Sequence, residues 1–198
     1  MTYALDFSTL PDDAAFERRS ILIGPPDDLK IRLGSMPQTL ERIESAIMFA
    51  ALASKQGEPW RAAAFLRAAL TEFCSIEEMH KLDRGKGVRF AVTASPNPLL
   101  HLLALMRHMN IHVKSVKVTP HKIGIIFDGI EGDLDSYVVS NLDAGDLASL
   151  WNGKHYDVSD LRRCVTWFNL RQTVWGAGDL IRMGTIIFAV QICTKFRL

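Results

Sequence analysis

Residues 95–118, SPNPLLHLLALMRHMNIHVKSVKV, decide the fold because the spacing of their apolar residues changes partway along. Up to Leu105 leucine is dense enough to predict a buried helix, and either Ser95 or Asn97, each followed by a proline, can cap its first turn. After His112 apolar and polar residues alternate, which is the pattern of a strand. The stretch therefore predicts a helix that passes directly into a β element.

Two further helices are predicted before this stretch. Region 36–55 has apolar residues at helical spacing, and Gly57 is expected to end that helix because glycine suits a left-handed cap. Region 58–81 has Pro59 where a first-turn proline is tolerated, and its apolar residues cover more than a narrow stripe. The first 35 residues are rich in turn-forming and acidic residues. They are expected to form an arm on the main body.

Strand patterns are short and follow the central helix. Between about residues 112 and 140, VKSVKV, KIGIIF and SYVVS predict either a hairpin or a three-stranded meander. Residues 88–94 alternate like a strand or an extended connector, and SILI at 20–23 resembles a short strand. Region 159–195 returns to helical spacing and predicts one or two long helices, with Gly176 and Gly178 as the expected break or kink.

These patterns together predict an α+β fold that is mostly α. The predicted organisation is an N-terminal arm (1–35) followed by a single helical-bundle domain (36–198). A small antiparallel β element, at about 112–140, is inserted before the final long helix. The switch between helical and strand spacing near His112 is the observation on which this prediction depends.

Composition limits the classes of function. Lys and Arg total 23 against 22 for Asp and Glu, which argues against a broad nucleic-acid footprint but allows a small basic cleft. Three cysteines lie far apart without a C-x-x-C spacing, so reduced cysteines in a cytoplasmic protein are expected. The N-terminus lacks the layout of a signal peptide, and the apolar stretch MGTIIFAVQIC is judged too short to cross a bilayer, so no membrane contact is expected.

The polar end of the central helix holds the candidate site. Arg107 and His112 have the spacing Arg-x4-His, with His108 directly after the arginine and the apolar run NPLLHLLALM before it. This arrangement resembles the motif of the HEPN superfamily of small helical-bundle proteins. In that family an arginine, a polar residue and a histidine follow one another at similar spacing. The resemblance covers roughly residues 36–112 and, more loosely, the last helix.

The resemblance implies a function and partners. Many members of this family are ribonucleases that need no metal or other cofactor, and they act in bacterial defence systems or on mobile elements. It therefore implies RNA as substrate, a homodimer with two facing motifs, and a cognate antitoxin as a further partner. The chain departs from the family because strands, rather than more helix, are predicted after His112.

The chemistry of such a site assigns a role to each residue. Cleavage of RNA through its own 2′-hydroxyl needs a base, a role that suits His112, and a cation for the phosphate, a role that suits Arg107. His108 and Asn110 would bind and orient the nucleotide. Residues five apart on a regular helix lie about 140° from each other. Arg107 and His112 therefore meet one phosphate only if the helix ends between them or if a second subunit completes the site.

Two other interpretations of the same residues remain open. Cationic side chains also stabilise the C-terminus of a helix without any further function. The chain would then be a non-enzymatic helical protein that assembles with itself or binds a partner through its apolar helices. The last helix, with Trp167, Trp175 and the run Ile186, Ile187 and Phe188, is the expected contact for a second copy.

Two groups of histidine and glutamate residues resemble metal sites, but neither is predicted to bind a metal. His101, His108 and His112 can share a helix face, but no carboxylate accompanies them, so His101 is interpreted as a core histidine with satisfied hydrogen bonds. Glu77 and His80 form one E-x-x-H motif without the second copy that a di-iron site needs. They are interpreted as part of a solvated helix face.

Overall fold

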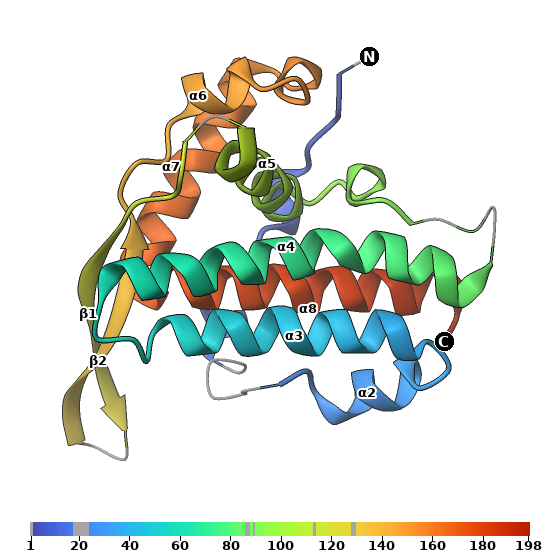
Figure 1. Cartoon of the computed structure of the whole chain (residues 1–198), viewed down its shortest axis with the longest axis horizontal. Helices are drawn as coiled ribbons and strands as arrows, with labels where there is room; N and C mark the ends of the chain where they lie inside the picture. Colours follow the sequence, from blue (N-terminus) through green and yellow to red (C-terminus); the bar gives the residue numbers. More distant parts are fainter. Residues whose placement is uncertain (1, 18–23, 86–87, 89, 113, 128–129) are drawn as a thin grey trace.

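The computed structural model describes residues 2–17, 24–85, 88, 90–112, 114–127 and 130–198 (Figure 1). It confirms the predicted α+β fold, in which helices predominate and a small antiparallel sheet precedes the final long helix. The elements in chain order are η1 (Phe7–Thr9), α1 (Asp13–Glu17), α2 (Asp27–Leu33), α3 (Pro37–Ala53), α4 (Pro59–Arg84), η2 (Val92–Ala94), α5 (Pro98–His112), β1 (Val118–Phe127), β2 (Ile130–Val139), α6 (Ala144–Ser149), η3 (Gly153–His155), α7 (Val158–Trp175) and α8 (Ala177–Phe196).

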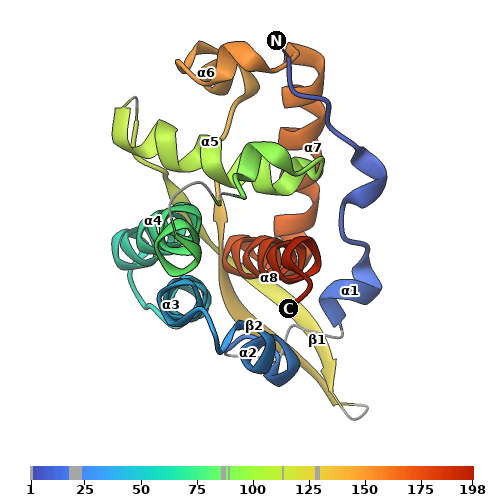
Figure 2. The ribbon, with the colours of Figure 1, turned by 90° about the vertical axis from the view of Figure 1, so that its right-hand side faces the viewer.

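Three long helices form the central layer of the molecule. Figure 1 shows α3, α4 and α8 side by side, and Figure 2, turned by 90°, shows them nearly end-on. Helices α5, α6 and α7 lie on one side of this layer, and α2 covers the other. Prolines stand at the first position of α3, α4 and α5, where their fixed φ favours the helix and no N–H is lost.

The last helical region is divided at Gly176. Its φ of 83° lies in the left-handed region, which glycine adopts at little cost. A Cβ at this position would also lie 2.0 Å from Oγ of Ser136 on β2. Only glycine satisfies both conditions. The predicted break in the last helical region therefore lies at Gly176 and separates α7 from α8.

Helix α8 is the buried core of the bundle. Ile186 and Phe188 are fully buried within one chain, so the expectation that they contact a second copy is wrong. The apolar stretch that was judged too short for a bilayer is part of α8, whose 20 residues are long and apolar enough to cross a membrane by length and composition alone. However, 67% of its most apolar window is buried inside the protein, as in the core helix of a soluble bundle.

The β element is an antiparallel hairpin, and within the described residues no third strand pairs with it. Val118 pairs with Val139 at the end nearest the helices. There the side chain of Gln172 on α7 bonds both backbone groups of Val139, accepting from N at 2.7 Å and donating to O at 2.9 Å. The Tyr137 hydroxyl donates to the carbonyl of Gln56 at 2.6 Å. These bonds dock one end of the hairpin on α7 and on the α3–α4 loop.

Three further predictions concern short segments, namely the end of α3, residues 88–94 and residues 20–23. Helix α3 ends at Ala53, and Gly57 does not have a positive φ, so the predicted glycine cap is wrong. The described residues of the stretch 88–94 form a connector with the 3-10 turn η2 and no strand. The expected strand at 20–23 lies outside the residues that the structure describes.

The N-terminal residues contact two parts of the bundle. The amide of Tyr3 donates to the carbonyl of His155 at 2.8 Å, which holds the first residues beside η3. Leu29 and Leu33 on α2 are fully buried and belong to the same hydrophobic core as the central layer. Part of the first 35 residues therefore contributes to the core.

Candidate functional site

A cavity of about 450 Å³ lies between α4, α5, η2, the turn around η3 and the N-terminal residue Tyr3. Helices α4 and α5 contribute most of its lining residues. Its lining residues are Tyr3, Cys74, Ser75, Glu77, Glu78, Met79, Val92, Thr93, Ala104, Leu105, Arg107, His108, Asn152, His155 and Tyr156. We call it the Arg107 cavity.

Arg107 contributes a cation to this cavity from the penultimate turn of α5. Its Nε atom is buried and has no hydrogen-bond partner among the described residues. A guanidinium has five N–H donors in a planar fork and prefers a carboxylate or a phosphate oxygen. Burial of such a donor without an acceptor is costly, so an acceptor that enters the cavity would remove a penalty.

Cys74 lies beside Arg107 but is not a nucleophile. Burial raises the pKa of its thiol to about 12, the charge of Arg107 opposes that rise, and Glu77 adds to it. The thiol is therefore protonated near neutral pH, and only a thiolate attacks efficiently. Cys164 and Cys193 are buried, and all three cysteines are free, as predicted from their spacing.

His108 faces the same cavity and is held by the turn at η3. The amide nitrogen of Asn152 lies 3.0 Å from Nε2 of His108. Because the amide nitrogen only donates, Nε2 accepts, and the proton of the neutral ring lies on Nδ1. Arg107 and His108, two of the four site residues expected from the sequence, are thus brought together in one cavity.

His155 is a second histidine of the cavity. Its ring meets the ring of Tyr3 edge-on at a centroid distance of 5.7 Å, while its carbonyl accepts the Tyr3 amide. The turn that carries it is closely packed, since a Cβ at Gly153 would lie 2.0 Å from the carbonyl oxygen of Leu147. Only glycine fits there, so the backbone of this turn packs directly against the backbone of α6.

His101 has its hydrogen bonds satisfied, as predicted. Its Nε2 lies 2.7 Å from the Ser95 carbonyl, which can only accept, so this nitrogen carries the proton. Its Nδ1 then accepts from the Tyr156 hydroxyl at 2.8 Å. Burial lowers the pKa of His101, which favours the neutral ring. In the described ranges of the chain, no cluster of three or more His, Cys, Asp or Glu side chains is placed to hold a metal ion.

Asn110 lies away from the cavity. Its amide nitrogen donates to the carbonyl of Met106 at 3.0 Å, and its amide oxygen accepts from the backbone N–H of Val116 at 2.6 Å. The side chain therefore caps the end of α5 and holds the chain that leads to β1. Both of its polar atoms are already bonded to the backbone.

His112 is the last residue of α5, and its side chain lies outside the described part of the structure. The backbone nevertheless bears on the proposed motif, because α5 is continuous from Arg107 to His112. Positions five apart on one helix point about 140° away from each other. Of the two ways in which Arg107 and His112 could meet one phosphate, an end of the helix between them is therefore excluded.

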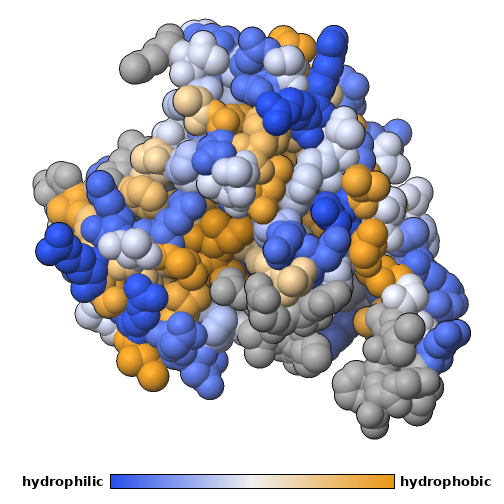
Figure 3. Space-filling view, turned by 180° about the vertical axis from the view of Figure 1, so that it is seen from behind, coloured by the Kyte–Doolittle hydropathy of each residue, from blue (hydrophilic) through white to orange (hydrophobic). Residues whose placement is uncertain are grey.

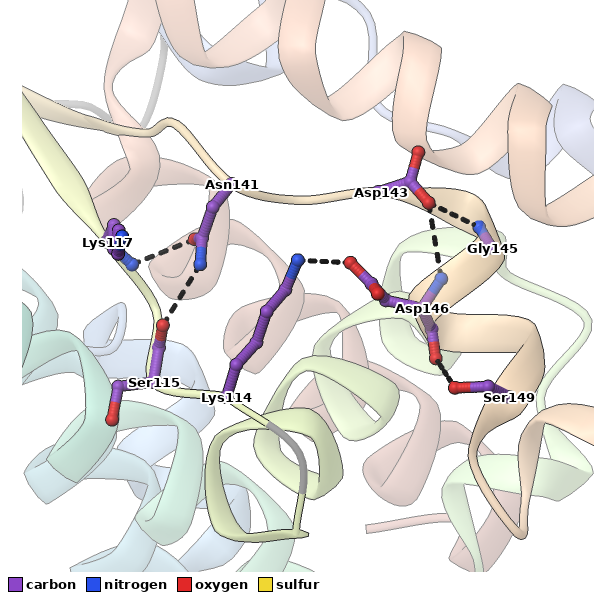
Figure 4. Close-up of polar contacts among 8 residues, drawn as sticks. All are labelled: Lys114, Ser115, Lys117, Asn141, Asp143, Gly145, Asp146 and Ser149. Atoms are coloured by element: carbon purple, nitrogen blue, oxygen red, sulfur yellow. Dashed lines mark hydrogen bonds and ion pairs between the residues drawn. The ribbon is translucent and has the colours of Figure 1, made fainter.

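A polar network fixes the chain directly after α5 (Figure 4). Lys114 forms an ion pair with Asp146 on α6, and the side chain of Asn141 bonds the backbone of Ser115 and Lys117 at 3.0 and 2.8 Å. Asp143 caps α6 by accepting from its first backbone N–H groups. The chain turns into β1 here, which confirms the departure from the HEPN pattern that the sequence predicted.

The E-x-x-H motif does not form a solvated face. Glu77 accepts the backbone N–H of Val92 at 3.1 Å. His80 is fully buried against Phe196, with ring centroids 4.6 Å apart, so the expectation of solvent exposure is wrong for it. The helix is longer than predicted and the C-terminal residues cover its end, which explains the difference.

A second cavity, of about 410 Å³, lies between the α3–α4 loop and the hairpin. Two of its polar groups are already bonded, because Tyr137 donates to Gln56 and His121 contacts the carbonyl of Thr173 at 2.7 Å. Its described lining residues include Lys55 and Lys122 but no arginine. The Arg107 cavity, which has a buried donor to offer, is therefore the better candidate site.

Three residues of the Arg107 cavity could not be found from the sequence. Tyr3, Asn152 and His155 come from the N-terminus and from the loop NGKHYD, which carry no motif and no periodic pattern. A scan against protein-family models, a search of curated proteins and a search of solved structures each gave no match to the chain. The resemblance to the HEPN superfamily therefore rests on the Arg107–His112 motif and its flanks alone.

Proposed function

We propose that the chain is a HEPN-like, metal-independent endoribonuclease of the cytoplasm that binds an RNA phosphate in the Arg107 cavity. The observation that carries the proposal is the buried Nε of Arg107, which has no hydrogen-bond partner within the described ranges. A phosphate is the acceptor that best matches a planar guanidinium. The cavity also offers two histidines, His108 to orient the nucleotide and His155 for proton transfer.

The proposed reaction divides the work among these three residues. His155 takes the proton of the 2′-hydroxyl, the 2′-oxygen attacks phosphorus, and the bond to the 5′-oxygen breaks. His108 orients the nucleotide, water gives its proton to the leaving 5′-oxygen, and Arg107 stabilises the charge that grows on the phosphate. The products are a 2′,3′-cyclic phosphate and a 5′-hydroxyl. DNA, which lacks the 2′-hydroxyl, would not be cleaved.

The negative charges on the α4 wall are already engaged. Glu77 accepts the Val92 amide, and Glu78 lies 3.5 Å from the ammonium group of Lys81. These contacts reduce the repulsion that a phosphate would meet in the cavity. We therefore place the phosphate against α5 and η3 rather than against α4.

His112 retains its expected role as general base only in an assembly of two copies. Because α5 is continuous, His112 would have to act on a phosphate held by Arg107 of the other subunit. The neighbouring Ile111 is 53% exposed, and an exposed apolar residue on the last turn of α5 favours a self-contact there. In this arrangement the homodimer would form through the end of α5, and the proposed antitoxin would cover the same end.

The test is an RNA-cleavage assay in EDTA with matched histidine variants. We expect Arg107→Ala and His155→Ala to lose about a hundred- to ten-thousand-fold in rate. His121→Ala is the control, since this histidine lies on the hairpin and outside the Arg107 cavity. Loss in His112→Ala with normal activity in His155→Ala would instead assign the base to the second subunit. Equal activity in all variants would indicate a contaminant and reject the proposal.

A second candidate function is non-enzymatic assembly. Ile31 on α2 is 81% exposed and Leu170 on α7 is 62% exposed, and apolar side chains gather across the middle of the back face (Figure 3). Such surface favours contact with another protein or another copy. A mass near 22.2 kDa in light scattering at micromolar concentration would exclude self-assembly.

A further inference from the structure

Trp151 is one of the most exposed large apolar side chains among the described residues. It is 80% exposed, although an indole ring normally buries a large apolar area. It directly precedes Asn152, which lines the Arg107 cavity and contacts His108. The most exposed tryptophan therefore directly precedes a residue of the candidate site in the sequence.

The turn places a cation on this ring. The ammonium group of Lys154 lies 3.2 Å from the centroid of the Trp151 ring. Gly153, between the two residues, is packed against the carbonyl of Leu147 so closely that no side chain fits. Lys154 therefore covers one face of the indole, and the large exposed fraction of the side chain leaves surface for a second planar group.

The charge of the turn indicates what that group is. The stretch WNGKHY, residues 151–156, carries Lys154 and His155 and no acidic residue. A flat π-surface beside cations is the arrangement with which proteins bind single-stranded nucleic acids, in which bases stack on aromatic rings and phosphates meet cations. An aliphatic protein partner would gain nothing from the ammonium group on the ring.

We propose that Trp151 stacks on an unpaired base of single-stranded RNA whose phosphate enters the Arg107 cavity. The inference rests on the proposed function, because it supplies the base-binding part of the same RNA site. It defines the substrate class as unpaired RNA, since a base inside a duplex offers no free face for stacking. Base identity is selected weakly, because every base has a π-face.

The test measures binding without cleavage. The probe is a fluorescein-labelled 2′-O-methyl hexanucleotide, which lacks the nucleophile, and affinity is measured by fluorescence anisotropy. We expect Trp151→Ala to weaken binding about five- to 100-fold and Trp151→Phe to restore most of it. Trp60→Ala is the matched control, because Trp60 is 65% exposed and also has a cation, that of Arg61, over its ring at 5.2 Å. Unlike Trp151, it has no sequence neighbour that lines the cavity.

Each outcome decides between the two proposals. Wild-type affinity in Trp151→Ala, or no binding of the probe by the wild type, would overturn the stacking inference whatever the cleavage assay shows. Equal losses in Trp151→Ala and Trp60→Ala would also overturn it. If the probe binds through Trp151 but unmodified RNA is never cleaved, the ribonuclease proposal fails and the base-binding site stands.

Discussion

The central layer and the cavity side of this bundle each contain a buried polar group without a hydrogen-bond partner, and they differ in whether a ligand could reach that group. In the layer of α3, α4 and α8, both ring nitrogens of His80 are buried without a hydrogen-bond partner in the described part of the chain. On the cavity side, His101 has both ring nitrogens bonded, while Nε of Arg107 and Nε of Arg171 are buried without a partner among the described residues, and of these two arginines Arg107 lines the cavity. An unpartnered group sealed in a core only lowers stability. An unpartnered donor that lines a cavity can instead bind a ligand. Arg107 is therefore the residue that points to a function.

Two arginines sharpen this comparison. Arg182 on α8 is 5% exposed and lies 2.9 Å from Asp179, one turn earlier on the same helix. Burial raises the pKa of Asp179 to about 6, and the charge of Arg182 opposes that rise. Arg182 thus has a carboxylate within the fold, whereas no described residue bonds Nε of Arg107. Arg182 therefore forms an ion pair within the fold, whereas Nε of Arg107 can still donate a hydrogen bond to a ligand.

The largest effect on stability is expected at Arg182. Replacement of Arg182 by Met keeps the apolar stem but leaves a partly buried carboxylate without its cation, so unfolding should become easier by about 3 kcal/mol. The matched variant Arg107→Met removes a donor that has no partner, and its stability should stay within about 0.5 kcal/mol of the wild type. Urea unfolding followed by circular dichroism measures both.

The opposite order would contradict the comparison. If Arg107→Met lowered the free energy of unfolding as much as Arg182→Met, Arg107 would be a structural residue. Its proposed role as a phosphate ligand would then lose its main support.

The next effect is expected at His101. His101→Leu removes two hydrogen bonds and leaves the Tyr156 hydroxyl and the Ser95 carbonyl buried without their partner. We expect a loss of about 2 kcal/mol in the free energy of unfolding, because each abandoned group keeps its desolvation cost. A denaturation midpoint equal to that of the wild type would mean that water replaces the imidazole.

The same substitution at His80 should act in the other direction. His80→Leu removes two buried nitrogens that have no partner and loses only the ring contact with Phe196. We expect a gain of about 1 kcal/mol, measured in the same urea titrations. A loss similar to that of His101→Leu would show that His80 has a polar partner after all.

The sequence allowed the prediction of those features that depend on local spacing. Leucine density up to Leu105 and alternation after His112 were enough to place α5 and the hairpin. The end of α3 was misplaced because Gly57 was given a capping role that requires a positive φ, which its backbone does not have. Local patterns cannot reveal that α8 is enclosed by other helices, since enclosure depends on how distant segments pack.

The candidate site was predicted only in part for the same reason. Arg107 and His108 belong to one recognisable helix end, and the cavity contains both. Asn110 belongs to that helix end as well, but its amide bonds the backbone of Met106 and Val116, a local use that spacing does not distinguish from ligand binding. His155 and Tyr3 reach the site only through the packing of the fold.

The last expected effect is a difference in pH dependence between the wild type and His80→Leu. Burial lowers the pKa of His80, and the charge of Arg84 adds to this, while Asp83 opposes it. A histidine whose folded pKa lies below its unfolded value of about 6.5 stabilises the fold above that pH, and the contribution is lost as the pH falls below it. The free energy difference between His80→Leu and the wild type should therefore widen below pH 6.5, by at most about 1.4 kcal/mol per pH unit.

The difference in free energy of unfolding between His80→Leu and the wild type excludes the contributions of other groups that titrate in the same pH range. Asp179, with its pKa raised to about 6, takes up a proton in the folded state first and so adds stability as the pH falls. His101 loses stability there as His80 does, since burial also lowers its pKa. Both contributions are present in the wild type and in His80→Leu, and they cancel when the two are subtracted. Urea titrations at pH 7.5, 6.5 and 5.5 give the free energy of unfolding of the wild type and of His80→Leu at each pH. We expect the difference between the two proteins to grow as the pH falls, because the central layer offers no partner for a proton on His80. A constant difference would mean that His80 has such a partner.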